Sequence, residues 1–401
     1  MKKAGIILFC KVFGAISNLI LGLLIARNFG ESAYAEFSIV LTLISLGLIF
    51  CNWGGANFII QESEEKKYPY FYQIFFLNLF FSGLYVFLIF LLKDFLNINY
   101  FLYYLFSIIF YTFFLTKSSV YILNDRQIIN SFIDDFLKNF LLMVSFISLI
   151  FLGFKNLDLI ILLYIFLLTI VSLYIFIDFW KSYKFPKNDL KSKEFFKNGF
   201  FVSTILVIIL LLSQADRFVI NHYLPSSELA SYFLCYSLMV TSSFFSQSLI
   251  SLYLPQIIKS IKNKENNTLE ILSRKYSKII ILITVFQIII LNLFLKIIFK
   301  LYKIDFYFQD YIVLNILLLG NLIAALFGLG MTVASYTDDK KSLAKRQLIV
   351  FLIHVPLLIV CVPYFGVIGA AIIYSFSQIL VKFLMYRFYI LKNINFFIYK
   401  F

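Results

Sequence analysis

The sequence predicts an all-α, polytopic membrane protein with twelve transmembrane helices in two six-helix lobes. The chain is 62% hydrophobic and only 14% charged, more apolar than a soluble protein of 401 residues needs to be. The apolar residues form successive runs of about 20, the length that crosses a bilayer. Lys and Arg gather in the short loops on one side, which is the charge bias of membrane proteins.

Twelve apolar runs are long enough to be spans. They cover residues 5–26, 37–60, 70–92, 101–123, 128–153, 158–180, 199–223, 228–254, 276–300, 310–335, 347–365 and 367–391. Only Pro363-Tyr364-Phe365-Gly366 separates the last two, and the combination of Pro and Gly predicts a tight turn there. The first run lacks a cleavage site, so we expect a first span rather than a signal peptide.

The loop charges predict the orientation. With twelve spans, 24 Lys and Arg fall on one side and six on the other, so both termini are predicted to be cytoplasmic. The net charge of +14 then reflects membrane orientation, and no nucleic-acid partner is expected.

A polar segment near the midpoint predicts the domain organisation. Residues 181–198 are predicted to be a cytoplasmic linker between an N-terminal lobe, 1–180, and a C-terminal lobe, 199–401. The lobes show weak similarity in order; at an offset of 213 residues, for example, Gly153 corresponds to Gly366. Six spans in each half indicate a parallel repeat, as in many transporters.

Asp216 and Arg217 are the most informative residues, because they lie side by side in what otherwise reads as a membrane helix. Ionisable groups at membrane depth are costly and mark function by default. A guanidinium holds a phosphate in bidentate fashion, and the neighbouring carboxylate can pair with it when the site is empty. A permanent structural ion pair is the alternative interpretation.

Further basic residues are candidates for the same site. Lys117 stands beside Thr116, Ser118 and Ser119, a cationic, hydroxyl-rich patch that suits a sugar-phosphate. Lys11 lies two turns inside the first span, and Arg27 ends that span, where a phosphate contact and interfacial anchoring are equally compatible.

Four acidic residues are candidates for coupling to protons or sodium: Asp216, Asp134, Asp135 and Asp178. Asp134 and Asp135 also precede Lys138 by one helical turn, so an intrahelical ion pair is an alternative for them. The sequence does not choose among the four.

Signals of an enzyme, a metal centre or a cofactor are missing from the sequence. The four cysteines are far apart, and the two histidines, His222 and His354, are isolated, which is more typical of turns and helix ends than of metal ligands. There is no P-loop, nucleophile elbow or paired-carboxylate site in an outward loop. We therefore expect a transporter without a metal or cofactor rather than an enzyme.

Three segments resemble a known family. They are LLIARNFG at 23–30, QADRFVI at 214–220 and YFGVIGAA at 364–371. Together and in this order they are similar to Wzx-type O-antigen and polysaccharide-unit flippases of the multidrug/oligosaccharidyl-lipid/polysaccharide exporter superfamily. The chain departs from the family pattern where Ala33 and Pro225 replace glycines, so substrate details do not transfer.

The resemblance implies a V-shaped flippase of the bacterial cytoplasmic (inner) membrane. Its substrate would be an undecaprenyl-pyrophosphate-linked oligosaccharide, such as an O-antigen (lipopolysaccharide) or capsule repeat unit, moved by alternating access through a cationic central cavity. Arg217 and Lys117, with Lys11 and Arg27, would attract the pyrophosphate. Membrane lipids, a polysaccharide polymerase and the chain-length machinery are the partners that such a role implies.

Three other functions remain open. A multidrug cation antiporter of the same superfamily would need unpaired acids within the spans. A membrane oligosaccharide polymerase or lipid-linked glycosyltransferase would need a large outward loop, and every outward loop is short. A flippase for the peptidoglycan precursor would share the fold.

Overall fold

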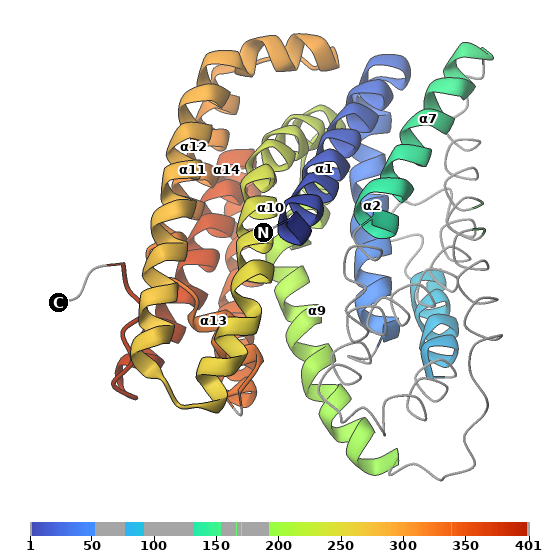
Figure 1. The fold of residues 1–401 in the computed structure, drawn as a ribbon. Helices are drawn as coiled ribbons and strands as arrows, with labels where there is room; N and C mark the ends of the chain where they lie inside the picture. The colour runs from blue at the N-terminus through green and yellow to red at the C-terminus, as the bar shows by residue number, and fades with distance from the viewer. Residues whose placement is uncertain are drawn as a thin grey trace. The chain divides into compact units, whose positions relative to one another are not determined.

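The computed structural model describes residues 2–52, 77–91, 132–153, 166, 170, 192–337 and 339–398. All regular secondary structure in these ranges is helical, which confirms the predicted fold class (Figure 1). Helices suit apolar runs of this length, because each helix satisfies its own backbone N–H and C=O groups where lipid offers no partners.

The first two helices are separated by a single glycine. Helix α1 (Lys2–Phe29) and helix α2 (Glu31–Asn52) flank Gly30, which has φ 92°. Glycine adopts this left-handed conformation without a steric penalty, and it commonly ends helices in this way. Gly22 of α1 lies against Tyr34 of α2, so closely that a Cβ on Gly22 would lie 3.0 Å from the Tyr34 ring.

The described part of the N-terminal half continues with a helix at Leu77–Leu91, a π-helix, η1 (Phe132–Leu137), and helix α7 (Lys138–Phe151). The Tyr85 hydroxyl donates a 2.8 Å hydrogen bond to the Leu43 carbonyl of α2. Gly153 follows α7 with φ 77°, in agreement with a turn between the spans predicted at 128–153 and 158–180. The spans predicted at 101–123 and 158–180 lie outside the described residues, apart from two positions in the second.

Long helices make up the C-terminal half. They are α9 (Ser192–Tyr223), α10 (Ser226–Lys262), α11 (Asn266–Tyr302), α12 (Phe308–Ala325), α13 (Gly330–Ser335) and α14 (Lys340–Ile390). The spans predicted at 199–223 and 228–254 are separate helices, and extended Pro225 (ψ 152°) immediately precedes α10.

The span predicted at 310–335 is interrupted, contrary to the continuous apolar run. Helix α12 ends at Ala325, Gly328 has φ 65°, and α13 begins at Gly330. The Ser273 hydroxyl of α11 accepts a 3.1 Å hydrogen bond from the Leu329 N–H. The Leu326 carbonyl accepts a 3.2 Å hydrogen bond from the Ile398 N–H. The broken helix is therefore tolerated because other segments satisfy its backbone.

Helix α14 is a helical hairpin. It reverses at Gly366 (φ 58°, ψ −146°), which divides it into a first arm, 340–365, and a second arm, 367–390. A Cβ on Gly369 would lie 2.8 Å from the Cys361 carbonyl oxygen, whereas eight residues of straight helix would separate these positions by about 12 Å. The turn predicted at Pro363–Gly366 is therefore confirmed.

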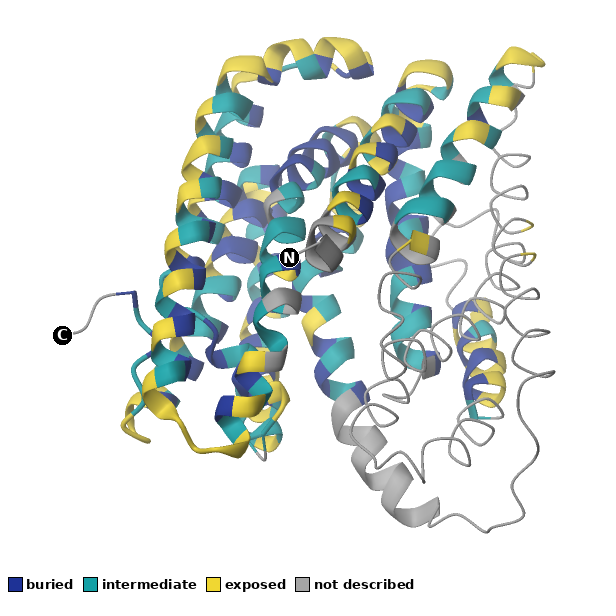
Figure 2. Ribbon diagram, viewed as in Figure 1, coloured by how far each residue is buried: buried dark blue, intermediate teal, exposed yellow. Residues whose placement is uncertain are grey.

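The described residues contain seven helices that are long and apolar enough to cross a membrane. Helix α11 shows how they meet lipid: its most exposed apolar residues follow one side at intervals of three or four (Figure 2), namely Leu282, Phe286, Ile289, Leu293 and Ile297. A continuous exposed apolar side is expected of a membrane protein, because lipid is its solvent. The chain is therefore a multi-pass membrane protein.

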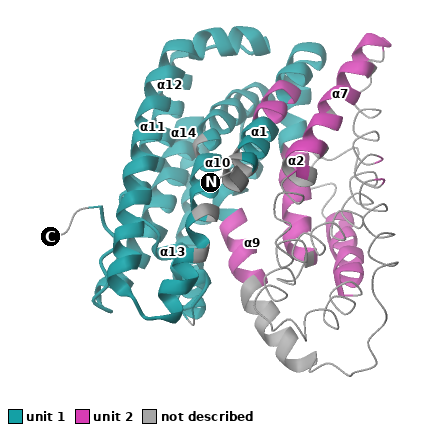
Figure 3. Cartoon of the chain, viewed as in Figure 1, with its two compact units in different colours: residues 1–15, 22–38, 211–401 teal, residues 16–21, 39–210 magenta. Residues whose placement is uncertain are grey.

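The chain forms two compact units (Figure 3). Unit 1 comprises Met1–Ala15, Gly22–Ser38 and Leu211–Phe401. Unit 2 comprises Ile16–Leu21 and Ile39–Leu210. Unit 1 thus includes stretches of α1 and α2 in addition to the C-terminal helices, and it contains the Asp216–Arg217 pair.

Candidate functional site

Asp216 and Arg217 lie in α9, two turns before the helix ends, and both are buried in unit 1. The two residues are 0% and 4% exposed. The long apolar sequence before them keeps α9 helical through this point, so the pair is held at membrane depth by the helix itself.

Helix α10 supplies the partner of the Asp216 carboxylate. The Tyr232 hydroxyl donates a short hydrogen bond to Oδ2, and the Arg217 backbone N–H donates one of 3.0 Å to Oδ1. Tyr232 is itself fully buried. Both carboxylate oxygens therefore accept hydrogen bonds, which is what a buried carboxylate requires.

The Arg217 guanidinium packs against two aromatic rings of α10. Its Cζ lies 4.7 Å from the Phe233 ring centre and 4.6 Å from that of Tyr236. Phe233 and Tyr236 are three residues apart, so they share one face of α10. Desolvated cation–π contacts of this kind contribute about 2 kcal/mol or more, which offsets part of the cost of burying the guanidinium.

These rings belong to a larger aromatic cluster, which we define as Tyr34, Phe233, Tyr236, Tyr302 and Tyr374. Tyr34 contacts Phe233 and Tyr302 with ring centres 5.0 and 5.7 Å apart, and Tyr236 contacts Tyr374 edge-on at 5.5 Å. The cluster joins α2, α10, α11 and α14 within unit 1. Arg217 is close enough to act electrostatically on the hydroxyls of Tyr34, Tyr236 and Tyr374.

The other predicted site residues are not part of this cluster. Arg27 is exposed in the last turn of α1, where its carbonyl lies 3.4 Å from the Lys303 ammonium, and Lys11 is half-buried in α1. Asp134 and Asp135 lie in η1, but their side chains are outside the description, and Lys117 and Asp178 lie outside the described residues. The structure thus places Asp216 and Arg217 together in one buried cluster, and the binding and coupling roles of all these residues stay predictions.

Two buried polar features were missed by sequence reasoning. Asp310, 1% exposed in the first turn of α12, accepts a 2.8 Å hydrogen bond from the Tyr307 N–H. Its position three residues after the N-cap residue Tyr307 is a capping signal that could have been recognised. His354 lies buried inside the first arm of α14, which contradicts the expected turn or helix end, whereas His222 does lie in the last turn of α9.

The described ranges contain no group of three or more His, Cys, Asp or Glu side chains placed to hold a metal ion. The arrangement at Asp216–Arg217 is instead a buried hydrogen-bonded carboxylate beside a guanidinium with cation–π contacts.

Comparison with known proteins finds similarity in structure only. No family model matches the sequence, and no curated protein matches it. Among solved structures, the lipid II flippase MurJ in an inward closed conformation has a TM-score of 0.69 and 16% identity, over 96% of this chain and 87% of that one.

Multidrug transporters of the MATE family are equally similar. The MATE multidrug transporter DinF-BH, in complex with a ligand, has a TM-score of 0.74 and 14% identity, over 100% of this chain and 97% of that one. An outward-facing MATE family transporter of the MOP superfamily has a TM-score of 0.68 and 14% identity, over 98% and 95% of the two chains.

These similarities define the class of fold. The chain has the fold shared by flippases and multidrug transporters of the MOP superfamily, a twelve-helix exporter fold, as the sequence predicted. The proteins compared are transporters and flippases rather than enzymes.

Proposed function

We propose that the protein is a flippase that carries an undecaprenyl-pyrophosphate-linked oligosaccharide, an O-antigen or capsule repeat unit, across the bacterial cytoplasmic membrane. Arg217 is the residue that binds the pyrophosphate, with Lys117, Lys11 and Arg27 as further cationic contacts. The fold supports transport of this general kind, because a lipid II flippase is among the proteins that share it.

The observation that carries the proposal is the buried guanidinium of Arg217. A guanidinium stays protonated at every physiological pH, so a site built around it favours an anionic head group and repels a cationic one. Phosphate oxygens accept paired N–H bonds from arginine, which combines charge with geometric fit.

The aromatic rings stabilise the site while no substrate is bound. With Phe233 and Tyr236 at 4.7 and 4.6 Å, Arg217 has a cation–π environment while it is shielded from solvent. Substrate binding in this proposal exchanges the rings for pyrophosphate oxygens, so α9 and α10 must separate locally before Arg217 becomes accessible.

The test is transport by the purified protein in proteoliposomes that contain a fluorescent polyprenyl-pyrophosphate oligosaccharide. Protection of the head group from an added impermeant quencher measures flipping. Arg217→Gln is expected to abolish it, and Arg217→Lys to restore only part, because an ammonium lacks the bidentate fork. Arg387→Gln is the matched control, since Arg387 is an exposed residue of α14. Undiminished flipping by Arg217→Gln would refute the role of Arg217.

A multidrug cation transporter is the second candidate, and two observations favour it. Multidrug transporters of the MATE family share the fold, and the aromatic cluster offers rings on which a flat organic cation could stack. Uptake of a fluorescent aromatic cation, such as a rhodamine dye, into the same proteoliposomes separates the two functions. Dye transport without oligosaccharide flipping would replace the flippase proposal.

A further inference from the structure

The first arm of α14 carries two buried polar side chains that the proposed function does not use. Gln347 is 0% exposed and His354 is 1% exposed. Seven residues apart, they lie on one face of the helix, about 10 Å from each other along its axis. Leu343, Val350 and Leu358 complete that buried face.

His354 is bonded across the hairpin to the second arm. Its Nδ1 lies 2.7 Å from the hydroxyl oxygen of Ser377, which is also buried. When Nδ1 carries the ring proton and donates it to Ser377, the other ring nitrogen, Nε2, presents a lone pair. That tautomer is ready to accept a second proton.

Three polar atoms on this face have no hydrogen-bond partner among the described residues. They are Nε2 of His354 and both Nε2 and Oε1 of Gln347. Buried polar atoms are nearly always hydrogen bonded, and ordered water serves those that the chain leaves over. The face between Gln347 and His354 is therefore where internal water is expected.

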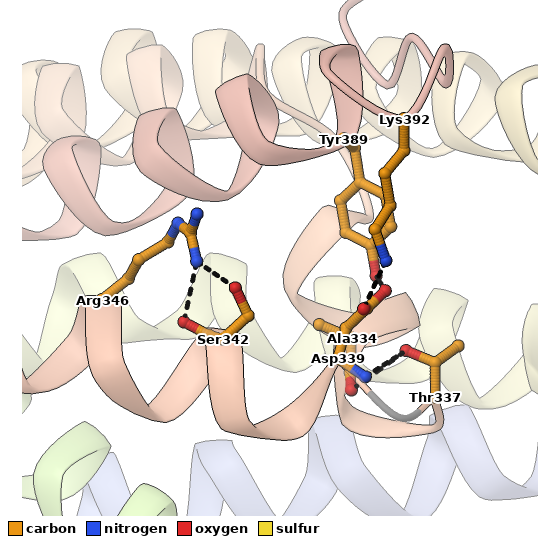
Figure 4. A network of polar contacts seen from close by, with 7 residues as sticks. All are labelled: Ala334, Thr337, Asp339, Ser342, Arg346, Tyr389 and Lys392. Atoms are coloured by element: carbon orange, nitrogen blue, oxygen red, sulfur yellow. Dashed lines mark hydrogen bonds and ion pairs between the residues drawn. The ribbon is translucent and has the colours of Figure 1, made fainter.

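Polar residues lie at the open end of the hairpin, from Asp339 to Arg346, the residue before Gln347 (Figure 4). Arg346 donates a 3.0 Å hydrogen bond to the Ser342 carbonyl. Asp339 accepts hydrogen bonds from the Tyr389 hydroxyl at 3.2 Å and from the exposed Lys392 ammonium. Titratable, solvent-accessible groups thus stand near the end of the arm where Gln347 begins the buried polar face.

The surroundings of His354 are neutral in the part of the chain that the structure describes. Besides Ser377, the polar group that acts on its ring is the Ile373 backbone. In the sequence of the second arm, the titratable residues that flank Ser377 are Tyr374, which contacts Tyr236 of α10, and half-buried Lys382.

The second arm meets α12 and α9 through two neutral hydrogen bonds, and its Tyr374 is also within electrostatic range of Asp216 and Arg217 of α9. Ser375 donates a hydrogen bond to the Ile316 carbonyl of α12, and Gln378 donates one to the Leu212 carbonyl of α9. Gly330 of α13 lies against the Tyr389 ring. A charge on His354 would therefore be introduced beside neutral polar partners, in a face of otherwise apolar side chains.

We propose that His354 is a proton-binding site, reached by water along Gln347 and oriented by Ser377, and that its protonation couples transport to the proton gradient. The ligand is a proton, since imidazole is the side chain that exchanges one near neutral pH. Charging an imidazole in an apolar hairpin favours arrangements that hydrate it, which links proton binding to a change in packing of the two arms. This coupling rests on the proposed transport function, whereas proton binding itself does not.

Proton binding is measured by NMR of ¹⁵N-histidine in lipid nanodiscs. The chain has two histidines, so His222→Asn leaves His354 as the sole signal. We expect its ring nitrogens to titrate as the pH is lowered from about 8 to about 3. Ser377→Ala is expected to change the tautomer ratio of the neutral ring. A ring that remains neutral throughout this range would overturn the proposal.

Coupling is measured as substrate accumulation driven by a pH gradient, with substrate exchange at equal pH as the reference. His354→Gln is expected to lower gradient-driven accumulation by about tenfold while exchange continues. Gln347→Leu removes the polar side chain along which water is proposed to reach His354, so it is also expected to lower gradient-driven accumulation. His222→Gln is the matched control, because His222 is exposed at the end of α9. Normal gradient-driven accumulation by His354→Gln would refute the coupling role.

The two tests separate this proposal from the function on which it rests. If the wild type transports neither the oligosaccharide nor the dye but His354 titrates, the proposed function fails and the proton site stands. If transport occurs and His354 does not titrate, the function stands and the proton site fails.

Discussion

Tyr232 of α10 donates its hydroxyl hydrogen to the carboxylate of Asp216 in α9, and both side chains are completely buried. A hydrogen bond to a buried charged group is among the stronger polar contacts in a protein, because loss of the donor leaves the carboxylate short of a partner. Two adjacent helices are therefore joined at the point where the charged pair lies.

Replacing Tyr232 by Phe removes this donor and little else. We expect Tyr232→Phe to destabilise the protein by about 2 kcal/mol, seen as a lower Tm in detergent. Tyr364→Phe is the control, because Tyr364 is 81% exposed at the hairpin turn. Equal Tm values for the two variants would show that the Asp216 contact adds no stability.

The interaction of Arg217 with Phe233 can be measured by a double-mutant cycle. We expect Phe233→Leu and Arg217→Gln to be coupled by about 2 kcal/mol or more, because each removes one partner of a desolvated cation–π contact. Thermal or denaturant unfolding of the wild type, the two single variants and the double variant gives the coupling. Additive effects would mean that the ring contributes only packing.

Gly328, in the break between α12 and α13, has no room for a side chain. A Cβ there would lie 2.0 Å from the Ser273 hydroxyl and 2.4 Å from the Phe396 carbonyl oxygen, and φ is 65°. We expect Gly328→Ala to destabilise the protein by about 1–3 kcal/mol. Gly83→Ala, in a helix with nothing within 4 Å of the added Cβ, is expected to be neutral or stabilising. A Tm of Gly328→Ala at or above that of Gly83→Ala would contradict this prediction.

Asn292 of α11 and Asn315 of α12 exchange two side-chain hydrogen bonds, of 2.9 and 2.8 Å. Interhelical bonds of this kind within membranes contribute about 0.6 kcal/mol on average and up to about 1.7. We expect the Ala double-mutant cycle to give a coupling in that range. A cycle between Asn28→Ala and Asn315→Ala is the control, because exposed Asn28 bonds only to its own helix in the described contacts. Coupling in that control cycle would show that the Asn292–Asn315 value does not report their hydrogen bonds.

Glu265, in the turn between α10 and α11, is expected to make the local structure pH-dependent. Hydrogen bonds from Asn263 (2.9 Å) and Thr268 (3.2 Å) hold the pKa of its carboxyl below the usual value. A lowered folded-state pKa means that these contacts stabilise the turn above the unfolded pKa, near 4.5, and that the benefit is lost as the pH falls through the folded value. Amide hydrogen exchange around residues 263–268, corrected for intrinsic rates, should accelerate at acid pH, and Glu265→Gln should remove that dependence.

The sequence was sufficient to predict the helical architecture, because span length and turn chemistry are local properties. Pro363 and Gly366 were enough to place the reversal inside α14. The break at Gly328 was not predictable, since it lies within an apolar run and is satisfied by Ser273, 56 residues away from Leu329 in the chain.

The candidate site was predicted only in part for the same reason. Asp216 and Arg217 were recognised because charge in an apolar run is unusual, but their partners Tyr232, Phe233 and Tyr236 belong to another helix. The prediction for His354 was wrong because the sequence around it gave no indication of Ser377 across the hairpin. Contacts between helices depend on packing, which apolar periodicity alone does not specify.

The position of Arg217 between two rings of α10 has a consequence for how such chains diverge. A buried arginine at this position is tolerated only while aromatic side chains pack against it. Those rings contribute less stability when no cation packs against them. Proteins that share the fold should therefore exchange residue 217 together with residues 233 and 236, so that these three positions vary as a set. Such covariation would distinguish a retained charge site from an incidental arginine.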